Sequence, residues 1–548
     1  MHRAMWISLG ATALLWPLGL DVDIQDHDEA TYAEIAREMV ETGEWRDQPC
    51  NYGPWFGHPI LSMWVMALGM KLFGATALGS RIPAAFEVLL LVGVTYVLGR
   101  WLWGRAEAAA GAALCAALPA MSLMGHNVKT DLNLMVATSG AIMLGARALD
   151  RPWLWVPTGI CAGLGMLTKG PFGLAMPGAV VLATLAWERR WRDLGRGWPW
   201  IIAGLIAFVA TFLPWNLFMW NRWGPPWFDS LYMDSTVRRF AGTNSSDGTT
   251  PLYFLHTLLW AAAPAVPTAL LALMTRLREL RGHLTRPPWP VLDLTWFFIP
   301  LVVMSLSSMK LPHYIFPVIP ALCAMAGRGA VELFAGRTSP RAELAVRVGT
   351  VFISAMLVLF ALAMITFTFP PPEGVGLLVL FLVGATVVVV LLVRAWRREP
   401  TAMIASICVA AALAMGLHNG AARPELSRYS PARMVAQVLD EDQAPRQRGT
   451  TVLTFTEIWR MAIPFYAHMR LEETDLGRIQ REAGAKPIYV LVNLDNLREL
   501  HANGFATRTR GFAFSYKTSR LSIPFSLVGN REDMATPLLL VQVWRREA

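Results

Sequence analysis

The chain has 548 residues, of which 54% are hydrophobic and only 16% are charged, and its mean hydropathy is +0.41. A soluble protein carries about one quarter charged residues, so this composition excludes an ordinary soluble protein. Most of the arginine excess behind the net charge of +9 lies in short loops between apolar segments. That placement is typical of membrane topology and of contact with anionic lipid, and it argues against a nucleic-acid partner.

Apolar segments long enough to span a bilayer recur along the first 418 residues. Arg3 directly precedes the first, and no small-x-small cleavage site follows before Asp21, so we expect an uncleaved anchor. The five cysteines show no disulfide or metal-site spacing. We predict about thirteen spans, at 4–20, 82–100, 107–124, 133–149, 153–167, 171–187, 198–219, 252–274, 291–307, 313–331, 347–369, 375–394 and 401–418.

The loops between these segments set the orientation. With this set of spans, the arginine clusters all fall on the same side as Arg3, which the positive-inside rule assigns to the cytoplasm. A further span at 59–73 would put them on alternating sides. We therefore expect 59–73, and the amphipathic segment 29–42, to be juxtamembrane helices in the outer interface. Along 29–42, Tyr32, Ile35, Ala36, Met39 and Val40 form an apolar face opposite Glu34, Arg37, Glu38 and Glu41.

The opposite side of the membrane receives a different set of polar residues, which are far apart in the chain. They are Asp28, His58, His126, Lys129, Asp131, Lys169, Arg238, Arg239, Lys310, His313 and Tyr314. Polar groups are costly near a bilayer unless they serve a function. Their convergence predicts a polar site at the periplasmic face.

After residue 418 the composition becomes that of a soluble domain. Runs typical of strands occur at 450–456, 486–492 and 538–544, and helical patterns occur at 431–439 and 494–503. The fold class expected is a polytopic α-helical membrane protein, with a transmembrane domain at 1–418 and a periplasmic α/β domain at 419–548. The first periplasmic loop, 21–81, carries the two juxtamembrane helices.

Several short motifs on the periplasmic side occur in a fixed order. They are DEATYAEIAREM from Asp28 with GEW fifteen residues later, TD at 130–131, LTKGP at 167–171, RRF at 238–240 and KLPHYIFP at 310–317. In order and spacing they resemble bacterial GT-C glycosyltransferases, most closely the lipid A aminoarabinose transferases and the related protein O-mannosyltransferase-like family. The likeness runs from the first span to about residue 330.

This resemblance implies a GT-C-like fold and a polyprenyl (undecaprenyl) phosphate-linked sugar as the donor. It implies that Asp28 is the central carboxylate of the site and Asp131 a second one, and that Arg239, Lys310 and Tyr314 contact the donor phosphate. The chain departs from the aminoarabinose-transferase pattern at Gly57-His58-Pro59, where that pattern has Glu-Lys-Pro. Thr31 replaces an Arg, and Asp234-Ser235 stands where a His precedes the Arg-Phe pair. Two residues associated with a bound metal and one phosphate-binding Lys are therefore missing.

The chemistry of the basic residues supports these roles, but each has a structural alternative. A departing lipid phosphate gains negative charge, so fixed cations should face it, and Arg can hold two of its oxygens. Adjacent Arg238 and Arg239 would point about 100° apart on a helix, so only one should reach the phosphate. Lys310 lies on the side of the membrane that has few basic residues. It therefore either has a local anion as partner or extends its alkyl chain along apolar surface to keep its ammonium in water. Three further residues could contact the phosphate: His58, Lys169 and Tyr314. Each could instead have a structural role, as an interfacial side chain or a helix cap.

The acidic residues also allow two interpretations. Asp28 is either a helix N-cap or a group that accepts a proton from, or orients, an acceptor. Asp131 is either a site carboxylate or the partner of a local ion pair with Lys129. Asp26 and His27, with Asp28, could bind a divalent cation, although such clusters also occur in solvated loops. Glu29, Tyr32 and His313 complete the candidate site.

We therefore expect a monomeric glycosyltransferase of the bacterial inner membrane, embedded in membrane lipids with its site facing the periplasm. It would move a sugar from the lipid phosphate to lipid A, lipopolysaccharide or another envelope glycan. The alternatives are a lipid-linked sugar flippase, a protein O-glycosyltransferase and a glycan receptor. Transporters place polar groups near the bilayer midplane between repeated halves, whereas here they lie at one face and no repeat is evident.

Overall fold

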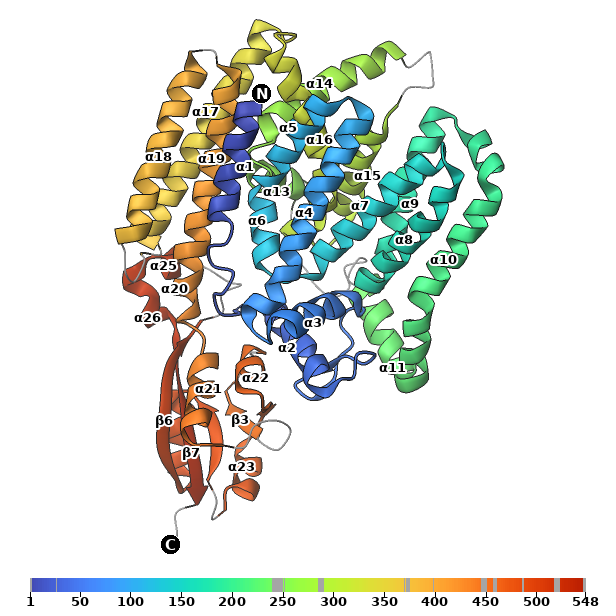
Figure 1. The fold of residues 1–548 in the computed structure, drawn as a ribbon. Helices are drawn as coiled ribbons and strands as arrows, with labels where there is room; N and C mark the ends of the chain where they lie inside the picture. The colour runs from blue at the N-terminus through green and yellow to red at the C-terminus, as the bar shows by residue number, and fades with distance from the viewer. Residues whose placement is uncertain are drawn as a thin grey trace.

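The computed structural model describes residues 2–25, 27–238, 250, 252–283, 290–368, 370, 375–397, 399–444, 451–456, 461–484, 487–516 and 523–545. A bundle of long helices forms one body, and a smaller domain with a β-sheet extends from one end of it (Figure 1). The N-terminus lies at the other end of the bundle.

Each predicted span coincides with a helix or a broken helix. The elements are α1 (His2–Leu15), α4 (Ala77–Leu102), α5 (Arg105–Ala116), α6 (Pro119–His126), α7 (Thr130–Ala148), η1 (Pro152–Leu154), α8 (Trp155–Lys169), α9 (Phe172–Glu188), α10 (Trp191–Trp223), α11 (Pro225–Phe228), η2 (Asp229–Arg238), α13 (Tyr253–Ala261), α14 (Val266–His283), α15 (Leu292–Leu306), η3 (Pro312–Val318), α16 (Ile319–Phe334), α17 (Pro340–Ala363), η4 (Met364–Thr368), α18 (Val375–Trp396) and α19 (Pro400–Leu417).

Length and composition qualify six of the helices in the described ranges to cross a membrane, or seven if the bent pair α5 and α6 is one span. The two helices of that pair meet at 54°. Pro119 opens α6, and a proline disfavours helical geometry in the residue before it, so Leu118 is extended and the axis bends. A polytopic helical membrane protein is confirmed, and the count of thirteen spans stays a prediction.

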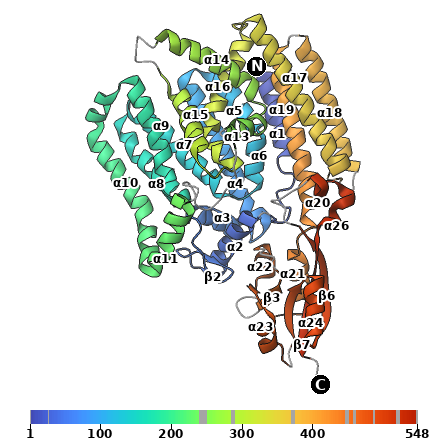
Figure 2. The ribbon, with the colours of Figure 1, turned by 180° about the vertical axis from the view of Figure 1, so that it is seen from behind.

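The predicted juxtamembrane helices are α2 (His27–Thr42) and α3 (Leu61–Phe73). In both views they lie across the end of the bundle, between it and the small domain (Figures 1 and 2). A two-strand hairpin, β1 (Pro49–Cys50) and β2 (Gly53–Pro54), connects them. Its turn residues Asn51 and Tyr52 have φ of 56° and 57°, the conformation that a tight two-residue hairpin turn requires.

The charged face of α2 is buried inside the protein, which its amphipathic pattern did not predict. Glu34 and Glu38 are 0% exposed and Arg37 is 1% exposed. The Arg37 guanidinium donates to both Glu34 carboxylate oxygens at 2.7 Å and lies 3.4 Å from Nδ1 of His468. The C-terminal domain covers this face. The amphipathic pattern of 29–42 gives the polar side correctly but cannot reveal that a segment more than 400 residues later buries it.

Glu38 gives this interface a pH dependence. Burial raises its pKa, the neighbouring Glu34 charge raises it further, and the result is about 8. The folded protein therefore keeps a proton that the unfolded chain has lost above its ordinary pKa of 4.5, and stability falls as the pH rises from 4.5 to about 8. Glu38→Gln should flatten this fall and raise the melting temperature at pH 9 relative to the parent. Melting temperatures at pH 6 and pH 9 measure this change, and Glu473→Gln, at an exposed position, is the control. If the melting temperature of E38Q fell between pH 6 and pH 9 as much as that of the parent, the prediction would be wrong.

The C-terminal domain follows α19 through a continuous helical segment, η5 (His418–Ala422) and α20 (Arg423–Ser427). Its sheet has the strand order β4-β3-β5-β7-β6, in which β3 is parallel to β4 and β5 and the other pairs are antiparallel. The elements are α21 (Ala432–Glu441), β3 (Thr451–Phe455), α22 (Ala462–Ala467), β4 (Arg470–Glu473), α23 (Leu476–Glu482), β5 (Ile488–Val492), α24 (Leu494–Ala502), β6 (Phe505–Ser515), α25 (Ile523–Ser526), η8 (Val528–Asn530), α26 (Arg531–Met534) and β7 (Thr536–Arg545). The predicted strands and helices are present, and a mixed α/β domain is confirmed.

Hydrogen bonds attach this domain to the loop between α1 and α4. The Asn51 side chain donates to the Leu471 carbonyl at 2.7 Å and accepts from the Leu471 amide at 2.8 Å, as a β-strand neighbour would. The Ile24 amide donates to the Tyr466 hydroxyl at 2.8 Å. The domain is thereby held against the loop that carries α2 and α3.

Candidate active site

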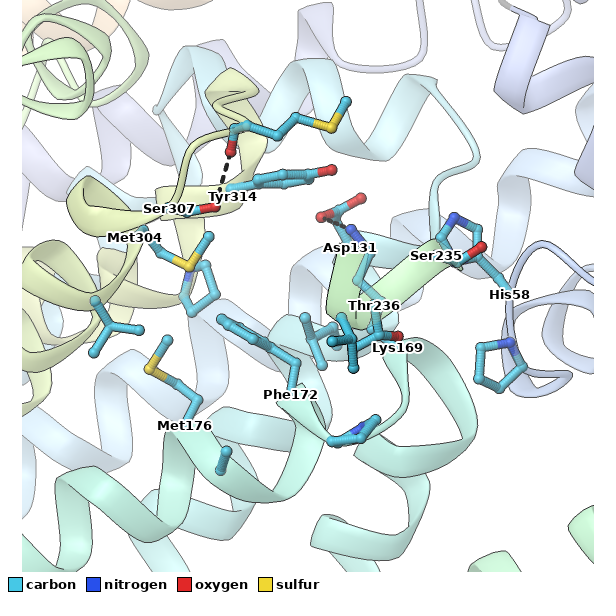
Figure 3. Close-up of a pocket in the computed structure, with 18 of the residues that line it drawn as sticks. His58, Asp131, Lys169, Phe172, Met176, Ser235, Thr236, Met304, Ser307 and Tyr314 are labelled. Carbon is cyan, nitrogen blue, oxygen red and sulfur yellow. Dashed lines mark hydrogen bonds and ion pairs between the residues drawn. The ribbon is translucent and has the colours of Figure 1, made fainter. Parts of the chain in front are cut away.

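Two cavities open where α2 and α3 meet the bundle. The larger, of about 570 Å³, is lined mainly by apolar side chains of the membrane helices. Figure 3 shows Phe172, Met176 and Met304 on one side of it and Asp131 and Lys169 on the other. An elongated apolar molecule with a charged end fits this distribution of side chains.

The smaller cavity, of about 210 Å³, has a polar lining. Its walls include Asp28 and Tyr32 from α2, Trp55 from the loop after β2, and Met461 from the C-terminal domain. Such a cavity suits a small hydroxylated group.

The two cavities meet at one set of residues. Both are lined by His58, Asp131, Lys169, Ser235 and Tyr314. A nitrogen-bearing ring, an ammonium and two hydroxyl groups therefore surround the passage from the apolar to the polar space. These are groups that donate hydrogen bonds to phosphate oxygens.

A charged pair fixes the geometry of this junction. Lys169, at the last turn of α8, places its Nζ 2.6 Å from Oδ1 of Asp131, in the first turn of α7. Nε2 of His313 lies 3.5 Å from the other Asp131 oxygen. The Lys169 ammonium is also 4.7 Å from the centre of the Tyr314 ring, over its face. Asp131 thus orients the Lys169 ammonium, and the charge of the sequence neighbour Lys129 also acts on this carboxylate.

Asp28 is the second residue of α2, so it lies in the first helical turn and is not the N-cap. A hydrogen bond from His27 lowers its pKa to about 2, and the nearby Lys129 and His58 charges act in the same direction against the effect of burial. The carboxylate is therefore ionised at neutral pH. A group with so low a pKa is a poor proton acceptor, so its chemistry is to accept hydrogen bonds from a ligand's hydroxyl or amino group.

The remaining predicted site residues lie in different environments. His27, Tyr32 and His313 line the polar cavity. Glu29 is 1% exposed and pairs with Arg81 at 2.8 Å. Burial is the largest single influence on its pKa and raises it, but the charge and hydrogen bond of Arg81, together with the Arg423 charge and the Val128 amide, outweigh burial and hold the pKa below its ordinary value. Lys310 donates to the Ser307 carbonyl at 2.7 Å and lines neither cavity. Arg238 pairs with Asp234. Asp26 and Arg239 lie outside the described residues.

Several lining residues were not predicted from the sequence. Trp55 and Cys50 lie in the loop between the juxtamembrane helices, where only the departure of Gly57-His58-Pro59 from the family pattern draws attention. Met461 belongs to a domain in which the sequence shows no binding motif, and no sequence signal connects it to the site.

The donor groups among the described residues do not fit a divalent cation, and the candidate ligand Asp26 lies outside them. The described residues hold no group of three or more His, Cys, Asp or Glu side chains placed for a metal. Gly57 stands where the family pattern has Glu, and a Cβ there would lie 2.4 Å from Cζ2 of Trp55. A carboxylate ligand at this position would therefore displace the indole from the cavity wall.

Comparison with known proteins places this site in a family. Residues 57–216 match the family described as dolichyl-phosphate-mannose-protein mannosyltransferase. The undecaprenyl phosphate-alpha-4-amino-4-deoxy-L-arabinose arabinosyl transferase of Pseudomonas paraeruginosa is 30% identical over 433 residues, which are 76% of this chain and 75% of that protein. The chain belongs to this arabinosyl transferase family. The resemblance inferred from the short motifs is therefore confirmed.

Other relatives of this transferase align over a shorter length. The arabinosyl transferase 1 of Pseudomonas fluorescens Pf0-1 is 30% identical over 341 residues, and this alignment spans 58% of that relative. The crystal structure of ArnT from Cupriavidus metallidurans bound to undecaprenyl phosphate superposes with a TM-score of 0.75, at 20% identity and 97% coverage of both chains. The transferase shares that fold along almost its whole length.

Proposed function

We propose that this transferase moves 4-amino-4-deoxy-L-arabinose from undecaprenyl phosphate to lipid A at the periplasmic face of the bacterial inner membrane. The sugar and carrier are those in the relatives' names. The arginine clusters in the loops between successive spans support thirteen spans, a periplasmic site and a periplasmic C-terminal domain.

The observation that carries the proposal is the order of the cavities. An apolar space, a junction with Lys169, His58 and Tyr314, and a polar space follow one another. A lipid-linked sugar has the same order of parts: a hydrocarbon chain, a phosphate and a sugar. A glycan receptor gives no reason for a phosphate-binding junction between two such cavities. A flippase would be expected to place its polar groups near the bilayer midplane between repeated halves.

The arrangement supports direct displacement at the anomeric carbon. An acceptor oxygen forms a bond to that carbon while the bond to the lipid phosphate oxygen breaks, and its electron pair leaves with the phosphate. The Lys169 ammonium stabilises the charge that grows there, and Asp131 keeps the ammonium in place. A lipid A phosphate is already anionic and needs no base, which agrees with an Asp28 carboxylate that holds a sugar hydroxyl or amino group rather than a proton.

Replacing Asp28 with Asn tests this function. D28N should lower sugar transfer at least about 100-fold, because an amide cannot replace an ionised acceptor in the transition state, while binding of undecaprenyl phosphate stays unchanged. Transfer to lipid A by the purified protein in detergent, measured by mass spectrometry, checks it. Asp495→Asn, on the exposed surface of α24, is the matched control. A parent protein without transfer, or a D28N variant with full transfer, would refute the proposal.

A further inference from the structure

The helical segment that leads from α19 into the C-terminal domain is fastened to helix α6 of the bundle at two points. In η5, the Asn419 side chain donates to the Ser122 hydroxyl at 3.1 Å. In α20, Nη1 of Arg423 donates to the His126 carbonyl at 2.7 Å. Asn419 is 1% exposed and Arg423 is 9% exposed, so both contacts lie inside the protein. The contacts are four residues apart on each segment, and they fix the start of the domain against the end of α6.

His126 is held firmly on its other side as well. Its ring is buried, with Nδ1 2.7 Å from the Ser122 carbonyl and Nε2 2.8 Å from the Trp16 carbonyl. His126 was among the polar residues expected to converge on the periplasmic face, but it lines neither cavity. Its carbonyl is a fixed acceptor for the Arg423 guanidinium, at the point where the chain leaves α6 for α7.

Arg423 also contacts the chain that enters α2. The Gln25 side chain donates to the Arg423 carbonyl at 2.9 Å, three residues before Asp28. A further bond closes the set, because the Val128 amide donates to Oε1 of Glu29 at 3.3 Å. Three segments are thereby joined in pairs: α20, the chain before α2 and the chain before α7. In both views α20 lies where the bundle meets the small domain (Figures 1 and 2).

The joined segments carry the two carboxylates of the site. Asp28 directly precedes Glu29, and Asp131 comes three residues after Val128. Both carboxylates line the polar cavity, although they belong to different helices. They have to face one substrate at the same time, and a displacement of about 1 Å can cost about 100-fold in rate. The bonds that join the two segments therefore bear directly on transfer.

We propose that Arg423 is a positioning residue for sugar transfer: its side chain holds the chain before α7, its carbonyl holds the chain before α2, and together they set Asp28 relative to Asp131. This rests on the proposed function and deepens it. Arg423 acts through other residues, because it lines neither cavity. A guanidinium is always charged and offers several donors in a rigid plane, which suits a fixed link. The start of the C-terminal domain is then part of the frame of the site.

Arg423→Met in the full-length protein should lower kcat for sugar transfer about tenfold. Its affinity for undecaprenyl phosphate should stay unchanged, because the pair of Asp131 and Lys169 within the bundle keeps the phosphate junction in place. Arg423→Lys, which keeps a cationic donor, should recover most of the loss. Gln25→Leu, which removes only the second bond, should lower kcat severalfold. Transfer kinetics by mass spectrometry and isothermal titration with undecaprenyl phosphate measure these effects.

Two other arginines separate positioning from a general loss of stability. Arg276→Met breaks a buried pair with Asp293, at 2.7 Å, and Arg276 lines neither cavity. It should lower the melting temperature in detergent, as R423M does, but leave kcat per folded molecule unchanged. Arg428→Met, directly after α20 and 64% exposed, should change neither quantity.

A double variant tests whether Arg423 acts through Asp28. R423M added to D28N should lose little more transfer than D28N alone, because the position of residue 28 matters little once its carboxylate is gone. A purely structural effect would add its full tenfold loss.

The outcomes separate this inference from the function beneath it. If the parent protein transfers the sugar but R423M and Q25L keep the kcat of the parent, or if R423M costs the full tenfold in the D28N background, the positioning role is wrong and the function stands. If R423M does not fold, Q25L alone and combined with D28N decides the matter by the same comparison. A parent protein that transfers no aminoarabinose refutes the proposed function itself.

Discussion

Lys169→Met should lower sugar transfer at least about 100-fold, as much as D28N, and should also weaken binding of undecaprenyl phosphate. The Lys169 ammonium lies at the junction of both cavities, 2.6 Å from Asp131. Its removal takes away the cation that faces the departing phosphate. It also leaves the Asp131 carboxylate, which is 8% exposed, directed at the same place, so that repulsion replaces attraction.

Two other lysines provide the comparison. Lys71→Met is the control, because that ammonium lies on the exposed surface of α3, 5.6 Å from the centre of the Trp45 ring. Lys310→Met should reduce sugar transfer and undecaprenyl phosphate binding much less than K169M does. The Lys310 ammonium donates to the Ser307 carbonyl of its own loop and lines neither cavity. Isothermal titration with undecaprenyl phosphate measures the binding of each variant, and a transfer assay measures its activity. A greater loss in K310M than in K169M would move the phosphate site to the loop before η3.

The membrane helices were predictable because their signal is local. Apolar runs define α4, α10, α17 and α18 regardless of what surrounds them, since the hydrocarbon core requires about twenty apolar residues in a row. The same reasoning predicted that Asp131 and Lys169, which are 38 residues apart in sequence, lie on the same side of the membrane, and the structure brings the two together. The sequence alone did not predict their contact, which depends on how α7 and α8 pack.

The sequence failed where long-range burial decides the role of a residue. Lys310 was expected to need a local anion because a lysine on that side breaks the topology rule; in the structure its ammonium donates to a backbone carbonyl, and its contact with phosphate stays a prediction. Glu29 belongs to the family motif but is the partner of Arg81 and not part of a cavity wall. Met461 reaches the polar cavity from a domain whose only predictable property was its mixed α/β pattern.

Arg81→Met should cost about 3–5 kcal/mol of unfolding free energy, the usual effect of removing one partner from a buried ion pair. Arg81 is 0% exposed, and its Nε and Nη2 donate to the Glu29 carboxylate at 2.8 and 3.2 Å. Its Nη1 donates to the Leu20 carbonyl at 2.9 Å and also to the Val22 carbonyl. Without the guanidinium, a carboxylate and the carbonyls of the chain before α2 remain buried without these donors.

The melting temperature in detergent measures this effect. Arg498→Met, which breaks the exposed pair with Asp495, should change it little. In the double variant Glu29→Met with Arg81→Met, much of the loss should be recovered, because no lone charge remains buried. Asp28 immediately precedes Glu29, so R81M should also reduce transfer although Arg81 lines neither cavity. An R81M protein as stable and as active as the parent would mean that the buried pair does not hold α2, and with it Asp28, in position.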